Sequence, residues 1–371
     1  MHLFDVAIVG GGPAGSSCAA SCAVAGLRTL VLDREKFPRE KVCGDCLNPS
    51  CWPVFERLEL TERVRDLPHS KLSSVEFIAI DGRKVIVDFP SGAGCEISVK
   101  RSLLDDLLLN RARELGADVH EQTTATGLSK NDHWKIETAS GEFFQARILI
   151  GADGRNSTVA RLCNLFPPSE RERVALQAHV PRRRDFGDRV VLQFLPEGYS
   201  GQAPVNETQL NLCLVGTPPT ISKLRKWAER QFDLPANQTW RTITPLTRSP
   251  VTSAHGNLFF IGDAARVVEP FTGEGIYYAL CSGELAANAV AKILRGADRH
   301  SALREFTRAY AEMYRGRLWI NRLARAAVLR PRVGSLFIHA ARTNPSILKL
   351  LTAKIVSATL SESSPHHWKP D

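Results

Sequence analysis

The sequence lacks an uninterrupted run of about 18 apolar residues, the minimum that a membrane-spanning helix needs. Its hydrophobic residues, 43% of the chain, are spread along its whole length. The apolar N-terminus also lacks the basic segment that opens a signal peptide, and it runs directly into a glycine-rich turn. We therefore expect neither an integral membrane protein nor a secreted one, and the expected location is the cytoplasm.

The cysteine pattern indicates neither a disulfide framework nor a metal centre. The nine cysteines are odd in number and scattered along 371 residues. Cys43 and Cys46 form a CxxC pair, but no second pair and no histidine cluster accompany it. Zinc is therefore not expected, and no metal site is predicted. The pair is interpreted as structural or as lying beside a reactive centre.

Acidic residues are scarce near the C-terminus. Residues 304–354 hold eleven lysines and arginines against two acidic residues, a local charge of +9 that equals the net charge of the chain. Such a segment could bind an anionic membrane surface or an acidic partner, or could form the solvated faces of ordinary helices. Nucleic-acid binding is not expected, because aromatic interleaving and a recognised motif are both absent.

The first 34 residues have the order strand, glycine turn, helix, strand. An apolar run at residues 3–9 precedes Gly10, Gly12 and Gly15, which form the pattern GxGxxG. These glycines permit a tight turn, close approach of the backbone to a pyrophosphate, and close packing of helix on strand. Asp33 ends the next apolar run, where its carboxylate can accept hydrogen bonds from ribose hydroxyls. This unit predicts a dinucleotide, which could be NAD or FAD.

Two later stretches distinguish the two cofactors: GADGRNSTVAR at 151–161 and FFIGDAARVVEPFTGEGIYYALCSG at 259–283. With the first turn they resemble the three FAD fingerprints of the aromatic hydroxylase-like flavoproteins. The resemblance implies non-covalent FAD in a Rossmann-type domain of the glutathione-reductase type. No second glycine fingerprint is present, so NAD(P)H or a reduced electron carrier is expected to act as a transient donor.

The resemblance also assigns cofactor-binding residues. It implies that the glycine turn binds the pyrophosphate and that Asp33 binds the ribose. Arg101 and Asp263 are expected to contact the ribityl portion of the cofactor, and the backbone at Ala125 is expected to contact the adenine. Backbone N–H groups at 273–276 are expected to face the flavin ring. The full expected set is Gly10, Gly12, Pro13, Ala14, Gly15, Asp33, Arg34, Cys43, Gly44, Arg101, Ala125, Asp153, Gly154, Gly262, Asp263, Gly273, Gly275 and Ile276.

The sequence near the flavin differs between branches of this superfamily. TGEGIYYALCSG at 272–283 and KVCGDCLNPS at 41–50 resemble the geranylgeranyl reductase family, in which a cysteine lies beside flavin and substrate. Residues 196–216 resemble that family's GYxWxFP segment, but Gly201 and Ala203 replace its large aromatic side chains. The WxWxIP motif of flavin-dependent halogenases is absent. Cys43 and Tyr199 are the candidate catalytic residues, with Tyr199 a candidate proton donor.

The pattern predicts an α/β fold in which a discontinuous FAD-binding domain occupies residues 1–70, 97–168 and 251–300. A mainly antiparallel β-sheet substrate domain is expected at 71–96 and 169–250, and a helical C-terminal region at 301–371. Residues 74–89 alternate like strands around the turn Asp81-Gly82.

These expectations favour an FAD-dependent oxidoreductase that reduces carbon–carbon double bonds of an apolar, isoprenoid or polyketide-like substrate. The alternatives are a monooxygenase that hydroxylates or epoxidises an aromatic or lipid-like substrate, and an FAD-binding electron-transfer protein. Peripheral membrane association through the basic C-terminal segment is part of the leading hypothesis. The oligomeric state is not predicted.

Overall fold

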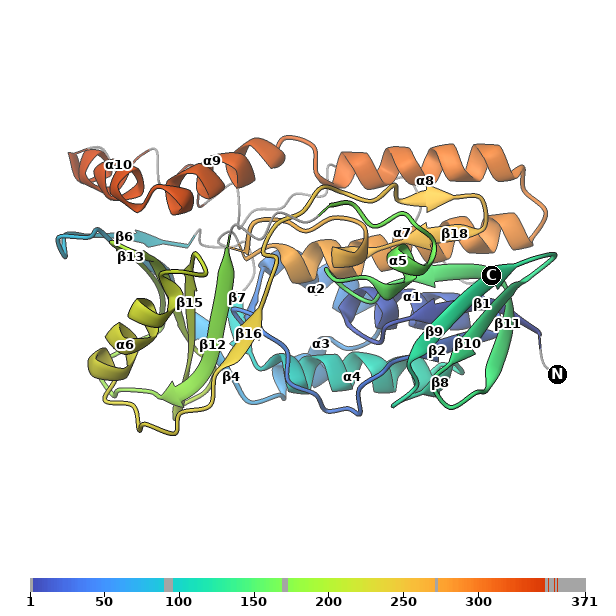
Figure 1. The fold of residues 1–371 in the computed structure, drawn as a ribbon, viewed down its shortest axis with the longest axis horizontal. Coiled ribbons are helices and arrows are strands. Elements are labelled where there is room, and N and C mark those ends of the chain that lie inside the picture. The colour runs from blue at the N-terminus through green and yellow to red at the C-terminus, as the bar shows by residue number, and fades with distance from the viewer. Residues whose placement is uncertain are drawn as a thin grey trace.

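The computed structural model places two large sheets side by side, with a line of helices along one edge (Figure 1). It describes residues 3–89, 96–168, 173–270 and 273–343, and three further positions at 346, 350 and 352. Within that part of the chain, no helix is long and apolar enough to cross a membrane.

An eight-stranded sheet contains the N-terminal strand at its centre. Its path runs β17-β18-β11-β1-β2-β8, and β10 and β9 extend it from β11 as antiparallel strands. The pairs β2–β1, β1–β11, β11–β18 and β2–β8 are parallel, as the βαβ connection requires. The strands are β1 (Leu3–Val9), β2 (Thr29–Leu32), β8 (Asp118–His120), β9 (Ala125–Lys130), β10 (Trp134–Thr138), β11 (Phe143–Gly151), β17 (Ala254–His255) and β18 (Leu258–Phe260).

Four helices pack on or beside this sheet: α1 (Pro13–Val24), α4 (Arg101–Glu114), α7 (Gly275–Leu294) and α8 (Arg299–Met313). The helices α1 and α7 touch closely because both carry small side chains. A Cβ at Gly283 of α7 would lie 2.5 Å from the carbonyl oxygen of Ala14 in α1. This packing fixes the glycine turn that opens α1 relative to the start of α7.

A seven-stranded sheet has the order β16-β12-β15-β14-β13-β5-β6, antiparallel throughout except for the parallel pair β13–β5. Its strands are β5 (Ser74–Ile78), β6 (Lys84–Asp88), β12 (Val174–Pro181), β13 (Arg189–Leu195), β14 (Gly198–Pro204), β15 (Gln209–Gly216) and β16 (Arg241–Ile243). One face buries Leu176, Leu212 and Leu214 against α6 (Ile221–Gln231). Figure 1 shows α6 on the outer side of this sheet.

Short elements connect the two large sheets. The strands β3 (Cys46–Leu47), β7 (Glu96–Val99) and β4 (His69–Leu72) form a small antiparallel sheet between them. Four short helical segments complete the connections: η1 (Pro49–Cys51), α2 (Trp52–Arg57), α3 (Thr61–Arg65) and α5 (Thr158–Leu162). A single turn, η2 (Gly262–Ala264), follows β18.

The C-terminal helices return to the seven-stranded sheet. From α8 the chain continues into α9 (Leu318–Leu329) and α10 (Pro331–Thr343). The helix α10 packs on β5, β6 and β13, and buries Ile338 and Ala341 with Val85 and Val87 of β6. Figure 1 shows α8, α9 and α10 along the upper edge, so they span both sheets.

The predicted α/β fold class, with its parallel FAD-type sheet and helical C-terminus, is confirmed. The region expected to be mainly antiparallel sheet at 169–250 also contains the helix α6, which was not predicted. This amphipathic helix begins at Ile221, directly after the turn residues TPPT at 217–220. It is short and lies between strands, so it is easily overlooked in the sequence. The domain boundaries stay a prediction, and the predicted helical region at 301–371 extends beyond the described residues.

Candidate functional site

One continuous cavity of about 760 Å³ lies between the two large sheets. Its wall combines residues of the glycine turn, the loop at 39–46, the start of α7 and one face of the seven-stranded sheet. Nearly all the predicted cofactor residues and both predicted catalytic residues, Cys43 and Tyr199, line it. Of the predicted set, Gly15 and Gly262 lie behind the wall.

The glycine turn is built from backbone close contacts. Gly10 has φ +109°, and a Cβ there would lie 2.5 Å from the carbonyl oxygen of Ala152. A Cβ at Gly15 would lie 1.8 Å from the carbonyl oxygen of Gly10, and one at Gly262 would lie 2.8 Å from the Cβ of Ala14. Gly15 and Gly262 therefore allow the packing that shapes the turn, and their direct contact with the cofactor stays a prediction.

The N-terminus of α1 faces the cavity without a side-chain cap. Pro13 occupies its first turn, no acidic residue lies there, and the N-cap Gly12 makes no side-chain hydrogen bond. The first N–H groups of a helix have no partner within it and carry a partial positive charge. Gly12, Pro13 and Ala14 line the cavity, so a phosphate there would meet the N–H groups of Gly12 and Ala14, while Pro13 has none to offer.

Asp33 holds the turn while it lines the cavity. Its Oδ2 accepts a hydrogen bond of 2.6 Å from the Gly11 N–H, and its Oδ1 accepts one of 2.9 Å from the Glu35 N–H. Arg34 is exposed and lines the same end of the cavity, while Ala125 is buried in its wall. This arrangement leaves the carboxylate beside the position expected for the ribose.

Four cations surround the turn and line the cavity: Arg101, which was predicted from the sequence, and Arg39, Lys41 and Arg155, which were not. Arg101 donates to both oxygens of the buried Asp105 at 2.7 and 2.8 Å, and Arg39 lies 3.1 Å from the same carboxylate. Burial, followed by the charge of Arg101, lowers the pKa of Lys41 to about 8. Its Nζ lies 3.4 Å from the position of a Cβ on Gly154.

Among the described residues, the four cations share only the carboxylates of Asp105 and Asp263, so excess positive charge remains beside a helix N-terminus. This charge suits an anionic ligand, and a bound anion would favour the ammonium form of Lys41. The pyrophosphate of FAD therefore fits this site, which combines the glycine turn, the uncapped N-terminus of α1 and the cation cluster. Asp263, predicted to contact the ribityl chain, lines the cavity and pairs with Arg155 at 3.1 Å. The start of α7 at Gly275 and Ile276, together with Gly273, lines the next part of the wall.

Asp153 has a structural role in addition to its place in the wall. Its Oδ2 accepts hydrogen bonds from the backbone N–H groups of Thr158 at 2.6 Å and Val159 at 3.0 Å. It therefore helps to fix the start of α5, and it lines the cavity together with Gly154.

The other end of the cavity is an apolar wall formed by the seven-stranded sheet. Its apolar residues are Val75, Phe77, Val190, Leu192, Val215 and Ile243 of the sheet, and Leu246 shortly after β16. Gly201 lies in the middle of this wall, where a Cβ would be 3.7 Å from Leu192 and 4.0 Å from Cys213. Packing therefore does not require a glycine at this position. The missing side chain enlarges the cavity instead.

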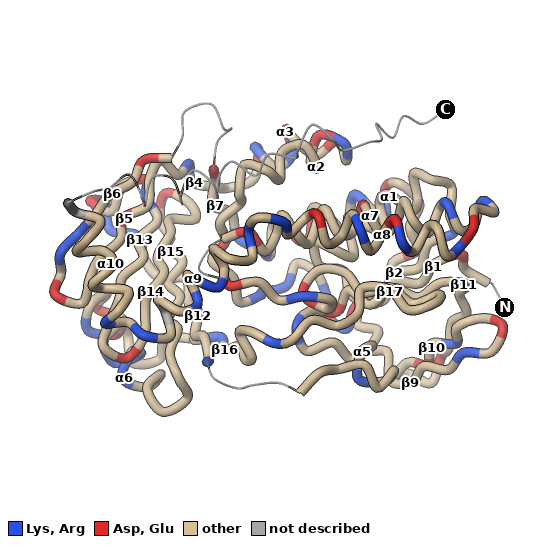
Figure 2. Tube along the Cα trace, turned by 90° about the horizontal axis from the view of Figure 1, so that it is seen from above, with Lys and Arg blue, Asp and Glu red and all other residues tan. Residues whose placement is uncertain are grey.

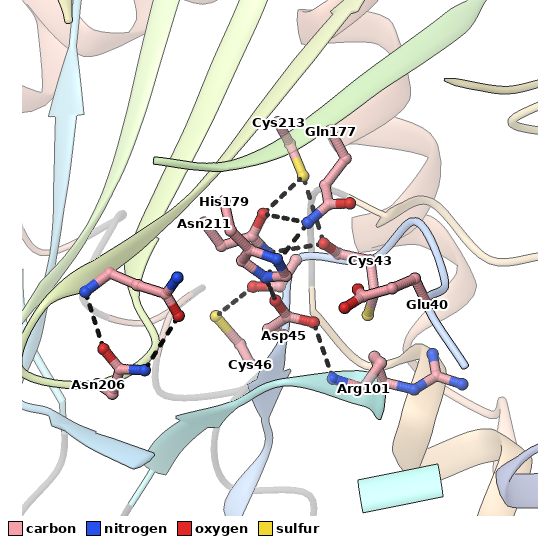
Figure 3. A network of polar contacts seen from close by, with 12 residues as sticks. Glu40, Cys43, Asp45, Cys46, Arg101, Gln177, His179, Asn206, Asn211 and Cys213 are labelled. Carbon is pink, nitrogen blue, oxygen red and sulfur yellow. Dashed lines mark hydrogen bonds and ion pairs between the residues drawn. The ribbon is translucent and has the colours of Figure 1, made fainter. Parts of the chain in front are cut away.

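A buried polar network joins the 43–46 loop to this sheet (Figure 3). His179 donates from Nε2 to Asp45 Oδ2 at 2.7 Å, and Asp45 Oδ1 accepts from the Arg101 N–H at 3.3 Å. Asn211 donates from Nδ2 to the carbonyl oxygen of Cys43 at 2.7 Å, and Cys213 lies 3.4 Å from that oxygen. The network fixes the loop that presents Cys43 and Gly44 to the cavity.

Three ionisable groups at this end keep their protons at neutral pH. Burial raises the pKa of the Cys43 thiol and of the Tyr199 phenol. It also raises the pKa of Glu96, a cavity residue of β7 that the sequence did not single out, to about 8. Cys43 and Cys46 are both free thiols, and no group of three or more metal-ligating side chains gathers in the described part of the chain.

The sequence offered no signal for Glu96 or for the His179–Asp45 pair. Each acquires its properties from tertiary burial or from contact with a distant residue. Lys41 is the first residue of the KVCGD stretch and Arg39 precedes it closely, so a place in or beside a recognised motif was the only indication of these two cations.

Comparison with known proteins identifies the family. The family described as FAD binding domain matches residues 4–314. An uncharacterized protein of Methanosarcina barkeri is 30% identical over 336 residues, which cover 85% of this chain and 81% of that protein. Menaquinone reductase of Mycolicibacterium smegmatis is 30% identical over 321 residues, covering 76% of this chain and 75% of its own. Digeranylgeranylglycerophospholipid reductase of Methanocaldococcus jannaschii is 26% identical over 335 residues, covering 84% and 83%.

Solved structures share the fold. The flavin-dependent brominase Bmp2 aligns with a TM-score of 0.77 at 20% identity, covering 97% of this chain and 95% of that one. The flavin-dependent halogenase CmlS aligns with a TM-score of 0.73 at 24% identity, covering 85% of this chain and 63% of that one. The family match over residues 4–314 confirms the predicted FAD cofactor, and the cavity fits it. The chain therefore belongs to the FAD-binding-domain family and is a geranylgeranyl-reductase-like, FAD-dependent oxidoreductase.

Proposed function

We propose that this enzyme reduces carbon–carbon double bonds of an apolar, isoprenoid or polyketide-like lipid. The observation that carries the proposal is the continuous cavity, because it joins the glycine turn to an apolar wall. FAD, when bound and reduced, supplies the hydride. The relatives named for menaquinone and for digeranylgeranylglycerophospholipid support a substrate with an isoprenoid chain.

The protein would exclude water from the reacting carbons and supply a proton. The side chains of Val190, Leu192 and Val215 present hydrocarbon to the cavity, which suits an isoprenoid chain. Tyr199 Oη and Cys43 Sγ remain the proposed catalytic groups, since burial keeps both protonated at neutral pH. Reprotonation of either group would follow from solvent after product leaves.

The electron donor is proposed to be NAD(P)H or a reduced carrier that binds transiently. We also propose that the enzyme works at a membrane surface, where such lipids reside. The support is the basic C-terminal segment, whose helices α9 and α10 carry exposed apolar and arginine side chains.

The test is anaerobic reduction of the holoenzyme by dithionite, followed by addition of digeranylgeranylglycerophospholipid in detergent. The expected result is reoxidation of the flavin together with a product two mass units heavier than the substrate for each reduced double bond. Reoxidation by oxygen alone would contradict the proposal, and oxygen-18 from O₂ in the product would favour the monooxygenase alternative. Flavin that passes electrons only to a protein carrier would favour the electron-transfer alternative.

A further inference from the structure

The segment 313–343 contains seven arginines and no aspartate or glutamate. It covers α9 and α10, whose arginines are drawn in blue in Figure 2. Arg322, Arg330 and Arg332 are exposed. Both helices therefore present positive charge without acidic side chains of their own to neutralise it.

Large apolar side chains share the exposed face with these arginines. On α10, Ser335, Ile338 and Ala341 are buried, whereas Leu336 is 65% exposed, and Val333 and Phe337 are exposed with it. On α9, Ile320 and Asn321 are buried, and the exposed apolar residues are Trp319, Leu323 and Leu329. In each helix the spacing of three and four residues puts the exposed set opposite the buried one.

We propose that α9 and α10 dock on the anionic surface of a phospholipid bilayer, and that α9 transmits docking through the buried Glu269 and Glu274 to the cavity-lining start of α7. Exposed leucine, tryptophan and phenylalanine side chains can enter the boundary between headgroups and acyl chains, while arginines pair with lipid phosphates. An acidic protein partner would match the arginines, but it would leave the interleaved apolar side chains in water.

The link to the flavin site runs through the buried side of α9. Asn321 is 7% exposed and accepts through Oδ1 a hydrogen bond of 3.0 Å from the Glu269 N–H. Its Nδ2 donates to Glu274 at 3.4 Å, and Arg317, just before α9, forms an ion pair with the same carboxylate. Glu274 is the N-cap residue of α7, whose first residues line the cavity.

Glu269 is also anchored to Arg173, which directly precedes β12 of the seven-stranded sheet. Arg173 donates to both of its carboxylate oxygens, at 2.7 and 3.1 Å, and both side chains are almost fully buried. A movement of α9 therefore acts on Glu274, which lies between Gly273 and Gly275 at the start of α7, and on Glu269, which precedes this motif. Because these pairs are buried, their geometry tolerates little displacement without breaking a bond.

Docking is tested with the FAD-loaded protein and two vesicle types, phosphatidylcholine alone and phosphatidylcholine mixed with phosphatidylglycerol. We expect cosedimentation with the mixed vesicles only, weakened by added salt. The double variant Leu336→Asp, Phe337→Asp should bind these vesicles at least about tenfold more weakly, because two apolar side chains no longer enter the lipid.

The matched control is Ile86→Asp. Ile86 is 56% exposed, and it alternates along β6 with Val85 and Val87, which are buried beneath α10. It therefore faces away from the proposed surface, and the control should bind vesicles like wild type. Equal binding by the double variant and wild type would overturn the docking surface. A dimer of the wild type that forms without lipid and is lost in the double variant would also overturn it, because the surface would then bind a second copy of the chain.

The coupling is tested by the flavin absorption spectrum and by hydrogen exchange of the first turn of α7, with and without mixed vesicles. We expect vesicles to change both signals in wild type. In Asn321→Ala we expect vesicle binding to persist while both responses fall by at least half. Should that variant fail to fold, Arg317→Lys keeps the charge and alters the geometry at Glu274. Responses that are absent in wild type or unchanged in the folded variant would overturn the coupling.

This inference rests on the proposed membrane location, but its readouts need no turnover. A protein that docks without reducing lipid and one that reduces lipid without docking are therefore distinguishable.

Discussion

The two ends of the cavity are specified in different ways. At the glycine turn the backbone sets the geometry, because Gly15 leaves no room for even one methyl group. At the seven-stranded sheet, side-chain size sets it, and Gly201 has room for more atoms than it carries. The first kind of site resists substitution and keeps one ligand, whereas the second can change substrate through a few side chains without changing the fold.

The strongest test of this contrast is Gly15→Ala. A Cβ would lie 1.8 Å from the Gly10 carbonyl oxygen, so α1 must separate from the turn. We expect the free energy of unfolding to fall by about 3 kcal/mol or more, and the purified protein to lose FAD. Urea unfolding and the flavin-to-protein absorbance ratio measure both effects. Retention of FAD at wild-type stability would show that close backbone contacts do not determine the geometry of the turn.

His179→Ala breaks the link between the two ends. Asp45 is buried, and the variant removes its hydrogen bond from His179. We expect a loss of about 2 to 3 kcal/mol in urea unfolding and faster alkylation of Cys43 by iodoacetamide. His179→Gln keeps a donor and should recover part of the loss. Equal alkylation rates in all three proteins would contradict a role for the pair in holding the Cys43 loop.

Glu96 should make stability depend on pH. Burial raises its pKa in the folded state from the ordinary 4.5 to about 8. Its contribution is therefore complete below about pH 4.5 and is lost as the pH rises towards about 8, at most by roughly 1.4 kcal/mol per pH unit. Glu96→Gln should flatten urea-unfolding stability across this window. Parallel pH profiles for the two proteins would show that Glu96 ionises normally.

Lys41→Gln should have opposite effects on the apoprotein and on FAD binding. Its lowered pKa indicates that the folded apoprotein disfavours the ammonium, so its replacement should stabilise the apoprotein near neutral pH. The affinity for FAD should fall about tenfold, because one charged contact to the pyrophosphate is lost. Calorimetry of apoprotein with FAD measures this. The exposed Lys36 provides the control Lys36→Gln, and an equal loss of affinity there would implicate general charge.

The smallest expected effect belongs to Gly201→Ala. A Cβ would make only ordinary contacts at 3.7 and 4.0 Å, so stability should stay within about 0.5 kcal/mol of wild type and FAD should remain bound. Gly201→Phe should also keep FAD, while raising the KM for an isoprenoid lipid, because the ring would occupy the cavity. Loss of FAD in either variant would show that the two ends are not independent.

The same contrast explains what could be predicted from the sequence. The turn, Asp33 and the start of α7 were predictable because a phosphate held by backbone demands glycines at fixed spacing. The pair of His179 and Asp45 was not, since its members stand 134 residues apart. The pKa shifts of Lys41 and Glu96 could not be predicted either, because burial by distant segments causes them. Substitution of the family's aromatics at Gly201 and Ala203 was visible, but only the structure shows that it enlarges the cavity.

The central claim is that one cavity holds FAD at its backbone-defined end and opens its flavin ring towards the apolar sheet. A crystal structure of the FAD-loaded protein tests this most directly. The account predicts the pyrophosphate at Gly12 and Ala14 among Arg39, Lys41 and Arg155, and the flavin ring beside Gly275 and Ile276. A pyrophosphate away from this turn, or a flavin ring separated from the wall at Gly201 by protein, would contradict it.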